Sequence, residues 1–123
     1  MLKSKKILIV DDEEEFLALL KQALEERGFE VVTATNAVDA GIEIVSSLPA
    51  LILLDIKMPG IDGLEACEVL KKNPNTKDVP IIVVSALSDE SDISDAKKAG
   101  VADYFVKPVD MERLIDRVKA IIG

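Results

Sequence analysis

The sequence contains no histidine and no tryptophan among its 123 residues, and only one cysteine, Cys67. Without histidine, the chain cannot carry out Ser-His-Asp or Cys-His catalysis by itself, and it cannot form a metal site with imidazole ligands. A single cysteine permits neither an internal disulfide bond nor a cysteine-based zinc site. We expect Cys67 to be a small buried residue, and the low cysteine content suits a reducing, cytoplasmic environment.

The sequence also lacks an apolar run close to the roughly 20 residues that a membrane-spanning helix needs. Residues 1–6 lead directly into an acidic stretch and contain neither the apolar segment nor the cleavage site of a secretory signal. The net charge is −8. An acidic chain without a basic stripe is a poor candidate for direct nucleic-acid binding or for adhesion to an anionic membrane. Divalent cations and basic surfaces of other proteins are more natural ligands.

Five short apolar runs alternate with amphipathic segments along the chain. The runs are residues 6–10, 30–34, 51–54, 81–85 and 104–106. The first, third and fourth are almost continuously aliphatic, which is typical of parallel strands buried on both faces. The other segments have apolar residues at helical spacing. One carries Phe16 to Leu24 and stops at Gly28, one covers 36–46, one opens at 62–65, one covers 89–98 before Gly100, and the last covers 111–122.

This order predicts an α/β fold, in which five βα units form a doubly wound parallel sheet with helices on both faces. No linker, low-complexity segment or second domain is evident, so we expect residues 1–123 to form a single domain. In such sheets, ligands bind beyond the carboxyl ends of the strands. The residues that follow each strand are therefore the candidate functional residues.

Polar residues follow four of the five predicted strands. They are Asp11 and Asp12 after the first strand, Asp55 after the third, Ser85 at the end of the fourth and Lys107 after the fifth. Each has a simpler interpretation: either of the first two aspartates as a helix cap, Asp55 as a turn residue, Ser85 as a strand-end hydroxyl and Lys107 as a surface charge. The fold places all five on one edge of the sheet, and this combination favours a functional site.

The chemistry of such a site follows from its residue types. Crowded carboxylates repel one another and need a cation, and a set of oxygen ligands points to Mg²⁺. A carboxylate beside Mg²⁺ can attack phosphorus and form an aspartyl phosphate, while a lysine and a hydroxyl stabilise the phosphoryl oxygens. The glycine-rich motifs GxGxxG and GxxxxGK[ST], which bind nucleotide phosphates, are both absent.

Four segments carry a resemblance to a known family. They are ILIVDDE at 7–13, LILLDIKMPGIDG at 51–63, IIVVSA at 81–86 and DYFVKP at 103–108. With these segments in this order, the sequence resembles the CheY-like response-regulator receiver domains of two-component signalling along its whole length. The resemblance implies a flavodoxin-like (βα)5 fold with strand order 2-1-3-4-5.

The resemblance also implies roles for individual acidic residues. Asp55 would be the phosphoacceptor. Asp11 and Asp12 would hold Mg²⁺ together with Asp55, with Asp12 favoured over Asp11 as a direct ligand. Lys57 would offer its backbone carbonyl oxygen to the metal.

Further roles follow for the fourth and fifth strands. Ser85 would donate its hydroxyl to the phosphoryl group, and Lys107 would pair with it through its ammonium group. The resemblance makes a cis Lys107–Pro108 peptide bond a natural expectation. Tyr104 would be the switch aromatic. Taken alone it would be interpreted as a half-buried strand tyrosine, but its position three residues before Lys107 favours the switch role.

Two positions are expected to border the phosphoryl group and to set its lifetime. These are Lys57 and Leu87, which follow Asp55 and Ser85 by two residues each. Because the leucine side chain cannot orient an attacking water, we hypothesise a rather stable phosphate. The Lys57 ammonium could act in either direction.

The resemblance implies a phosphorylation-dependent signalling switch, not an enzyme acting on external substrates. A sensor histidine kinase or a histidine phosphotransfer protein would donate the phosphoryl group, because this chain has no histidine. The face formed by the fourth helix, the fifth strand and the fifth helix would then change its affinity for a downstream protein or effector domain. The same face is a candidate surface for a homodimer formed on activation.

Three alternatives remain open at this point. The chain could be a receiver-fold interaction module that works without phosphorylation, although no site residue is missing. It could be the N-terminal domain of a DNA-binding response regulator. It could also be a haloacid-dehalogenase-like phosphatase, but that family needs an acid two residues after its nucleophile, where this chain has Lys57.

Overall fold

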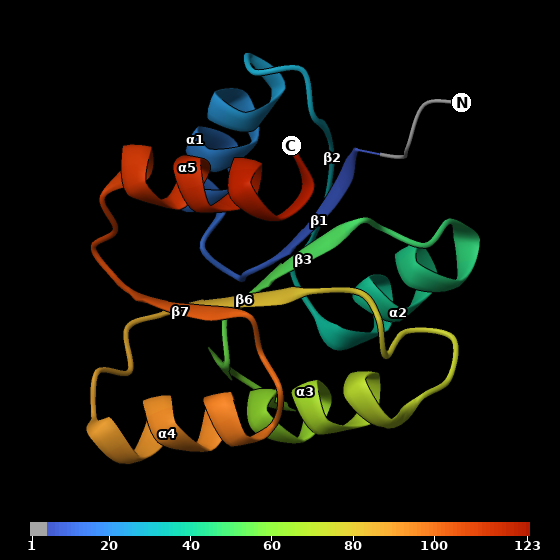
Figure 1. The fold of residues 1–123 in the computed structure, drawn as a ribbon, viewed down its shortest axis with the longest axis vertical. Helices are drawn as coiled ribbons and strands as arrows, with labels where there is room; N and C mark the ends of the chain where they lie inside the picture. The colour runs from blue at the N-terminus through green and yellow to red at the C-terminus, as the bar shows by residue number, and fades with distance from the viewer. Residues whose placement is uncertain (1–4) are drawn as a thin grey trace.

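Five parallel strands form one sheet in the computed structural model, which describes residues 5–123 (Figure 1). Its strands are β1 (Lys6–Val10), β2 (Glu30–Ala34), β3 (Leu51–Leu54), β6 (Ile81–Ser85) and β7 (Asp103–Val106). The helices are α1 (Glu14–Glu25), α2 (Ala37–Ser46), α3 (Gly63–Lys72), α4 (Glu90–Lys98) and α5 (Met111–Ile122). Residues 1–4, part of the segment in which we expected no secretory signal, lie outside the described residues.

The strand order in the sheet is β2-β1-β3-β6-β7. In terms of successive strands of the sheet, this is the order 2-1-3-4-5, so the predicted doubly wound topology is confirmed. The registers align the ends of neighbouring strands, because Val10 pairs with Leu54 and Ser85 pairs with Val106. The residues that follow these strands are therefore brought to one edge of the sheet.

Helices cover both faces of this sheet, with α1 and α5 on one side and α2, α3 and α4 on the other (Figure 1). Side chains along each central strand alternate between the two sides. In β1, for example, Ile7 and Ile9 pack under α1 and α5, whereas Leu8 and Val10 pack under the other three helices. Because both faces are covered, β1, β3 and β6 are buried at every position, which explains their almost continuously aliphatic sequences.

The helix boundaries follow local capping signals. The side chain of Asn36 accepts a hydrogen bond from the Asp39 amide at the start of α2, and Asp62 accepts one from the Glu65 amide at the start of α3. Gly28, after α1, has a φ of 89°, a conformation that glycine adopts without strain. Asp62 therefore caps α3 where the sequence predicts that a helix opens, and the expected stop at Gly28 is present.

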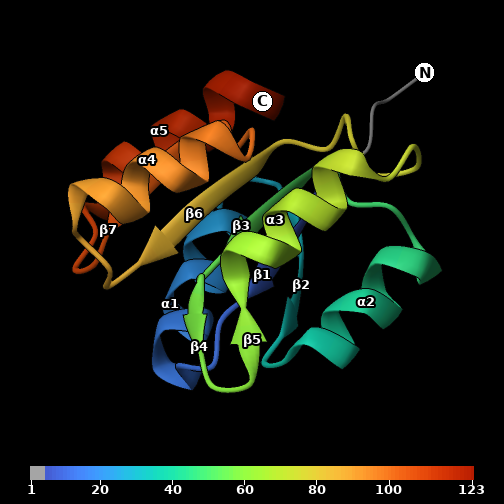
Figure 2. The same cartoon turned by 90° about the horizontal axis from the view of Figure 1, so that it is seen from below.

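A short antiparallel hairpin lies between β3 and α3 (Figure 2). Its strands are β4 (Lys57–Met58) and β5 (Ile61–Asp62), and Gly60 in the intervening turn has a φ of 76°. The sequence predicts only a turn here, because two-residue strands are too short to show an alternating pattern. The hairpin folds α3 back toward the sheet, so that Gly63 lies directly against the backbone of Ile56.

Cys67 lies on α3 and is completely buried, as expected. Burial, followed by the nearby charge of Glu68, raises the pKa of the Cys67 thiol to about 11. Because the thiolate is the reactive form, Cys67 is an inert core residue at neutral pH. Among residues 5–123, no helix is both long and apolar enough to cross a membrane.

Substitution of Gly63 tests the close approach of α3 to Ile56. A Cβ atom at position 63 would lie 2.7 Å from the Ile56 carbonyl oxygen and closer still to the Ile56 Cα atom. Since backbone atoms cannot move aside cheaply, we expect Gly63→Ala to lower the free energy of unfolding by about 1–3 kcal/mol in urea denaturation.

The matched control is Gly41→Ala in α2, where an added Cβ meets no atom within 4 Å. This change should raise the free energy of unfolding by about 0.5–1 kcal/mol, because alanine favours the helix. Equal effects of the two substitutions would contradict the packing argument.

Candidate functional site

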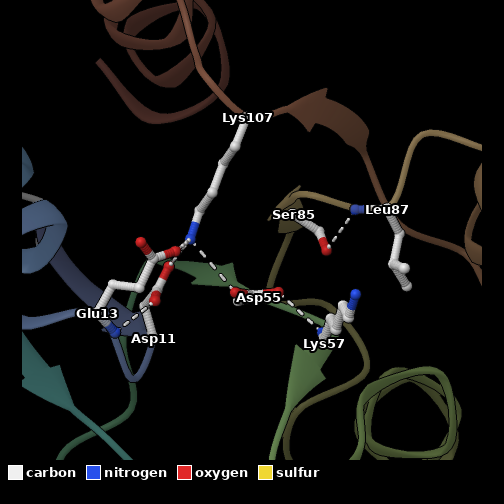
Figure 3. Close-up of polar contacts among 7 residues, drawn as sticks. All are labelled: Asp11, Glu13, Asp55, Lys57, Ser85, Leu87 and Lys107. Carbon is white, nitrogen blue, oxygen red and sulfur yellow. Dashed lines mark hydrogen bonds and ion pairs between the residues drawn. The ribbon is translucent and has the colours of Figure 1, made fainter.

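Three of the predicted site residues meet at the carboxyl edge of the sheet. Asp11 follows β1, Asp55 follows β3 and Lys107 follows β7 (Figure 3). The Lys107 Nζ atom lies 2.7 Å from Asp11 Oδ2 and 3.3 Å from Asp55 Oδ2. A strand at the edge of the sheet therefore supplies the cation for two carboxylates that follow its central strands.

Both carboxylates are buried, and each is held in the same way. Asp11 Oδ1 accepts a hydrogen bond of 2.9 Å from the Glu13 amide, and Asp55 Oδ1 accepts one of 2.8 Å from the Lys57 amide. The Oδ2 atoms face Lys107. Each aspartate thus combines the local role of a turn or helix-start residue with a role in the site. No buried side-chain nitrogen or oxygen atom in the described part of the chain lacks a partner.

The ionisation of this cluster reflects burial and pairing together. Burial raises the pKa of Asp11 above its usual range, although hydrogen bonds from Lys107 and the Glu13 amide act in the opposite direction. Burial disfavours the Lys107 ammonium, but the carboxylates of Asp11 and Glu13 outweigh it and raise the pKa of Lys107. Lys107 is therefore a permanent cation at any physiological pH.

Asp12 completes an acidic trio with Asp11 and Asp55. One carboxylate oxygen from each lies within 4.8 Å of the other two, and Asp12 is exposed whereas the other two are buried. Hard oxygen ligands with an open side toward solvent suit Mg²⁺, which keeps several of its waters. The residues present therefore fit the metal that the sequence predicts. Metal coordination by the Lys57 carbonyl remains a prediction.

Ser85, Leu87 and Tyr104 are linked by two hydrogen bonds beside this cluster. The Leu87 amide donates to Ser85 Oγ at 3.3 Å, and the Tyr104 hydroxyl donates to the Leu87 carbonyl oxygen at 2.6 Å. Burial raises the pKa of Tyr104, so its hydroxyl stays protonated and able to donate. Tyr104 is half-buried. The Lys107–Pro108 peptide bond is cis.

Two residues of this region were not expected from the sequence. Glu13 Oε1 lies 2.6 Å from Lys107 Nζ, and the Phe16 ring centroid lies 4.6 Å from the same atom. In the sequence, Glu13 belongs to an acidic run that favours the start of a helix, and Phe16 is one of the apolar residues at helical spacing in that helix. A hydrogen bond that spans 94 residues leaves no local signal in the sequence.

Known proteins of one family resemble this chain over nearly its whole length. Residues 7–119 match the family model of the response regulator receiver domain. The phosphate regulon transcriptional regulatory protein PhoB of Rhizobium meliloti is 40% identical over 117 residues, which are 95% of this chain and 52% of PhoB. The response regulator PleD of Caulobacter vibrioides is 36% identical over 118 residues, or 96% of this chain and 26% of PleD. The chain thus spans about half or less of these curated relatives.

Solved structures give the same result. The signal receiver domain of a response regulator from Bermanella marisrubri superposes with a TM-score of 0.90 at 36% identity, covering 98% of this chain and all of that one. A receiver domain protein described as CheY-like, from Methanospirillum hungatei, has a TM-score of 0.87 at 32% identity, covering 96% of this chain and 93% of its own. With the family match extending over nearly the whole sequence, the chain belongs to the response regulator receiver domain family of two-component signalling.

Proposed function

We propose that this chain is a phosphorylation-dependent switch in which Asp55 accepts a phosphoryl group from a histidine kinase or a histidine phosphotransfer protein. The observation that carries the proposal is the convergence of Asp11, Asp55 and Lys107, in which one ammonium group contacts both buried carboxylates. Phosphoryl transfer needs a nucleophile beside positive charge, and this arrangement supplies both.

In the proposed reaction, a carboxylate oxygen of Asp55 attacks the phosphorus atom of a phosphohistidine on the donor protein. A phosphorus–oxygen bond forms, the phosphorus–nitrogen bond breaks, and the electron pair of that bond leaves with the imidazole nitrogen. Lys107 pairs with the developing charge on the phosphoryl oxygens, and the Ser85 hydroxyl donates a hydrogen bond to one of them. Asp11, Asp12 and Asp55, with the Lys57 carbonyl, would hold Mg²⁺, which when bound neutralises charge on the transferring group.

The proposed output depends on the link from Ser85 through Leu87 to Tyr104. A new phosphate adds about −1.5 to −2 units of charge and three acceptor oxygens, to which Ser85 would turn. The Leu87 amide donates to Ser85, and the Leu87 carbonyl oxygen accepts from Tyr104. Movement of Ser85 would therefore shift Leu87 and change the position of Tyr104 on β7. The face formed by α4, β7 and α5 would then change its affinity for a downstream protein, an effector domain or a second copy of the chain.

The proposal places residues 1–123 in the cytoplasm as one receiver unit that signals and does not hydrolyse external substrates. Lys57 occupies the position where a haloacid-dehalogenase-like phosphatase carries an acid, and its side chain is exposed. If acetyl phosphate does not phosphorylate the wild type, the favoured alternative is a receiver-fold interaction module that works without phosphorylation.

Intact-mass measurement after incubation with acetyl phosphate tests the acceptor directly. We expect a gain of one phosphoryl group that requires Mg²⁺, because the acidic trio needs a cation before an anionic donor can approach. Asp55→Asn should show no gain, because an amide cannot act as the nucleophile. A gain that persists in Asp55→Asn would place the acceptor elsewhere, and no gain in the wild type would favour the interaction module.

Thermal unfolding tests the metal site without any phosphodonor. Mg²⁺ at about 100 times its dissociation constant should stabilise the folded protein by about 2.7 kcal/mol, because it binds the folded acidic trio. Asp12→Asn should shift this stabilisation to higher Mg²⁺ concentrations. Glu14→Gln removes the same charge from a residue outside the trio and serves as the control. Equal responses of the two variants would show only a general charge effect.

The rate of dephosphorylation tests the role of Leu87. We expect Leu87→Glu to shorten the phosphate lifetime by about tenfold, because a carboxylate at this position can orient water by a charge-assisted hydrogen bond. Leu87→Met, which keeps an apolar side chain of similar volume, should leave the lifetime close to that of the wild type. A wild type that loses phosphate faster than Leu87→Glu would disprove the hypothesis.

A further inference from the structure

The ammonium group of Lys107 has more partners than the proposed reaction uses. Its three hydrogens face three carboxylates, those of Asp11 at 2.7 Å, Glu13 at 2.6 Å and Asp55 at 3.3 Å (Figure 3). A lysine ammonium has only three hydrogens to donate, so these contacts use its full capacity. The two shorter contacts are with residues of the segment that follows β1, and the contact with Asp55 is the longest of the three.

The three partners differ sharply in burial. The side chains of Asp11 and Asp55 are 2% and 5% exposed, whereas that of Glu13 is 62% exposed. A buried carboxylate that loses its cation is left without compensation, which is costly. An exposed carboxylate is hydrated as soon as it is released, so its ion pair is weak. Glu13 is therefore the partner that Lys107 can give up at least cost.

The local structure does not explain the position of the Glu13 side chain. Glu13 is the N-cap residue of α1, yet its side chain makes no capping hydrogen bond. Its amide is already satisfied by Asp11, and glutamate is not a preferred N-cap residue. Glu14 and Glu15 supply the negative charge that favours the first turn of a helix. What remains for the Glu13 carboxylate is its contact with Lys107.

We propose that Glu13 is a positioning residue for Lys107, a displaceable counterion that restrains the ammonium group in the unphosphorylated protein. The inference rests on the proposed function, because it concerns the same lysine. For Lys107 to move toward Asp55 and bond more than one phosphoryl oxygen, one existing partner must leave. Glu13 leaves to solvent, and the phosphoryl group takes its place. The contact stabilises only the unphosphorylated state, so Glu13 opposes phosphorylation.

The first test compares Glu13→Gln with Glu14→Gln. Both remove one negative charge from the start of α1, but of these two described glutamates only Glu13 forms an ion pair with Lys107. With acetyl phosphate and Mg²⁺, we expect Glu13→Gln to be phosphorylated about two- to fivefold faster than the wild type, the range that an exposed ion pair supports. Glu14→Gln should stay closer to the wild-type rate. Equal acceleration in both would show that net charge alone is responsible and would overturn the inference.

A double-mutant cycle shows whether Glu13 acts through Lys107. In a Lys107→Met background the ammonium is absent, so the additional change Glu13→Gln should have no effect on the phosphorylation rate. A full effect in that background would overturn the inference. If the wild type accepts no phosphoryl group at all, the proposed function fails and the inference fails with it. If the wild type is phosphorylated but Glu13→Gln matches it, only the inference fails.

The same cycle separates positioning from a role in the stability of α1. A purely structural effect of Glu13→Gln would persist in the Lys107→Met background, whereas an effect exerted through the ammonium group would disappear there.

Discussion

Two carboxylates, those of Asp11 and Asp55, lie almost completely buried at the end of an apolar parallel sheet. Such charges destabilise a fold unless a cation and hydrogen-bond donors accompany them. Lys107 supplies the cation, and the turns that follow β1 and β3 supply backbone amides. The parallel direction of the strands makes this possible, because it brings the carboxyl ends of β1, β3 and β7 to one edge of the sheet. Fold and site therefore depend on the same arrangement.

Much of the fold is readable from local sequence. The aliphatic runs mark β1, β3 and β6 because strands covered on both faces are apolar at nearly every position. Caps such as Asp62 mark helix starts through contacts over three residues. The β4–β5 hairpin escaped prediction because its strands have only two residues each. Its geometry depends on the close approach of Gly63 to Ile56. The spacing of apolar residues along the sequence does not predict this tertiary contact.

Part of the candidate site could likewise be predicted from the sequence, and part of it could not. The convergence of Asp11, Asp55 and Lys107 could be predicted, because the topology alone places strand ends together. The partnership of Lys107 with Glu13 could not, since it depends on side-chain conformation at the start of α1. The roles of turn aspartate and site aspartate are also not alternatives in this chain. Each carboxylate has two oxygen atoms, and Asp11 and Asp55 use one for the backbone and the other for Lys107.

Leu87 connects Ser85 to Tyr104 solely through main-chain atoms, its amide and its carbonyl group. The side chain at this position takes no part in either hydrogen bond. Exchanging the side chain therefore need not break the path between the two residues. If the proposed signal passes along this path and the side chain governs how long a phosphate persists, the transmission of the signal and its duration depend on different atoms of one residue. Substitutions of the Leu87 side chain could then change the phosphate lifetime while the hydrogen bonds that link Ser85 to Tyr104 stay in place.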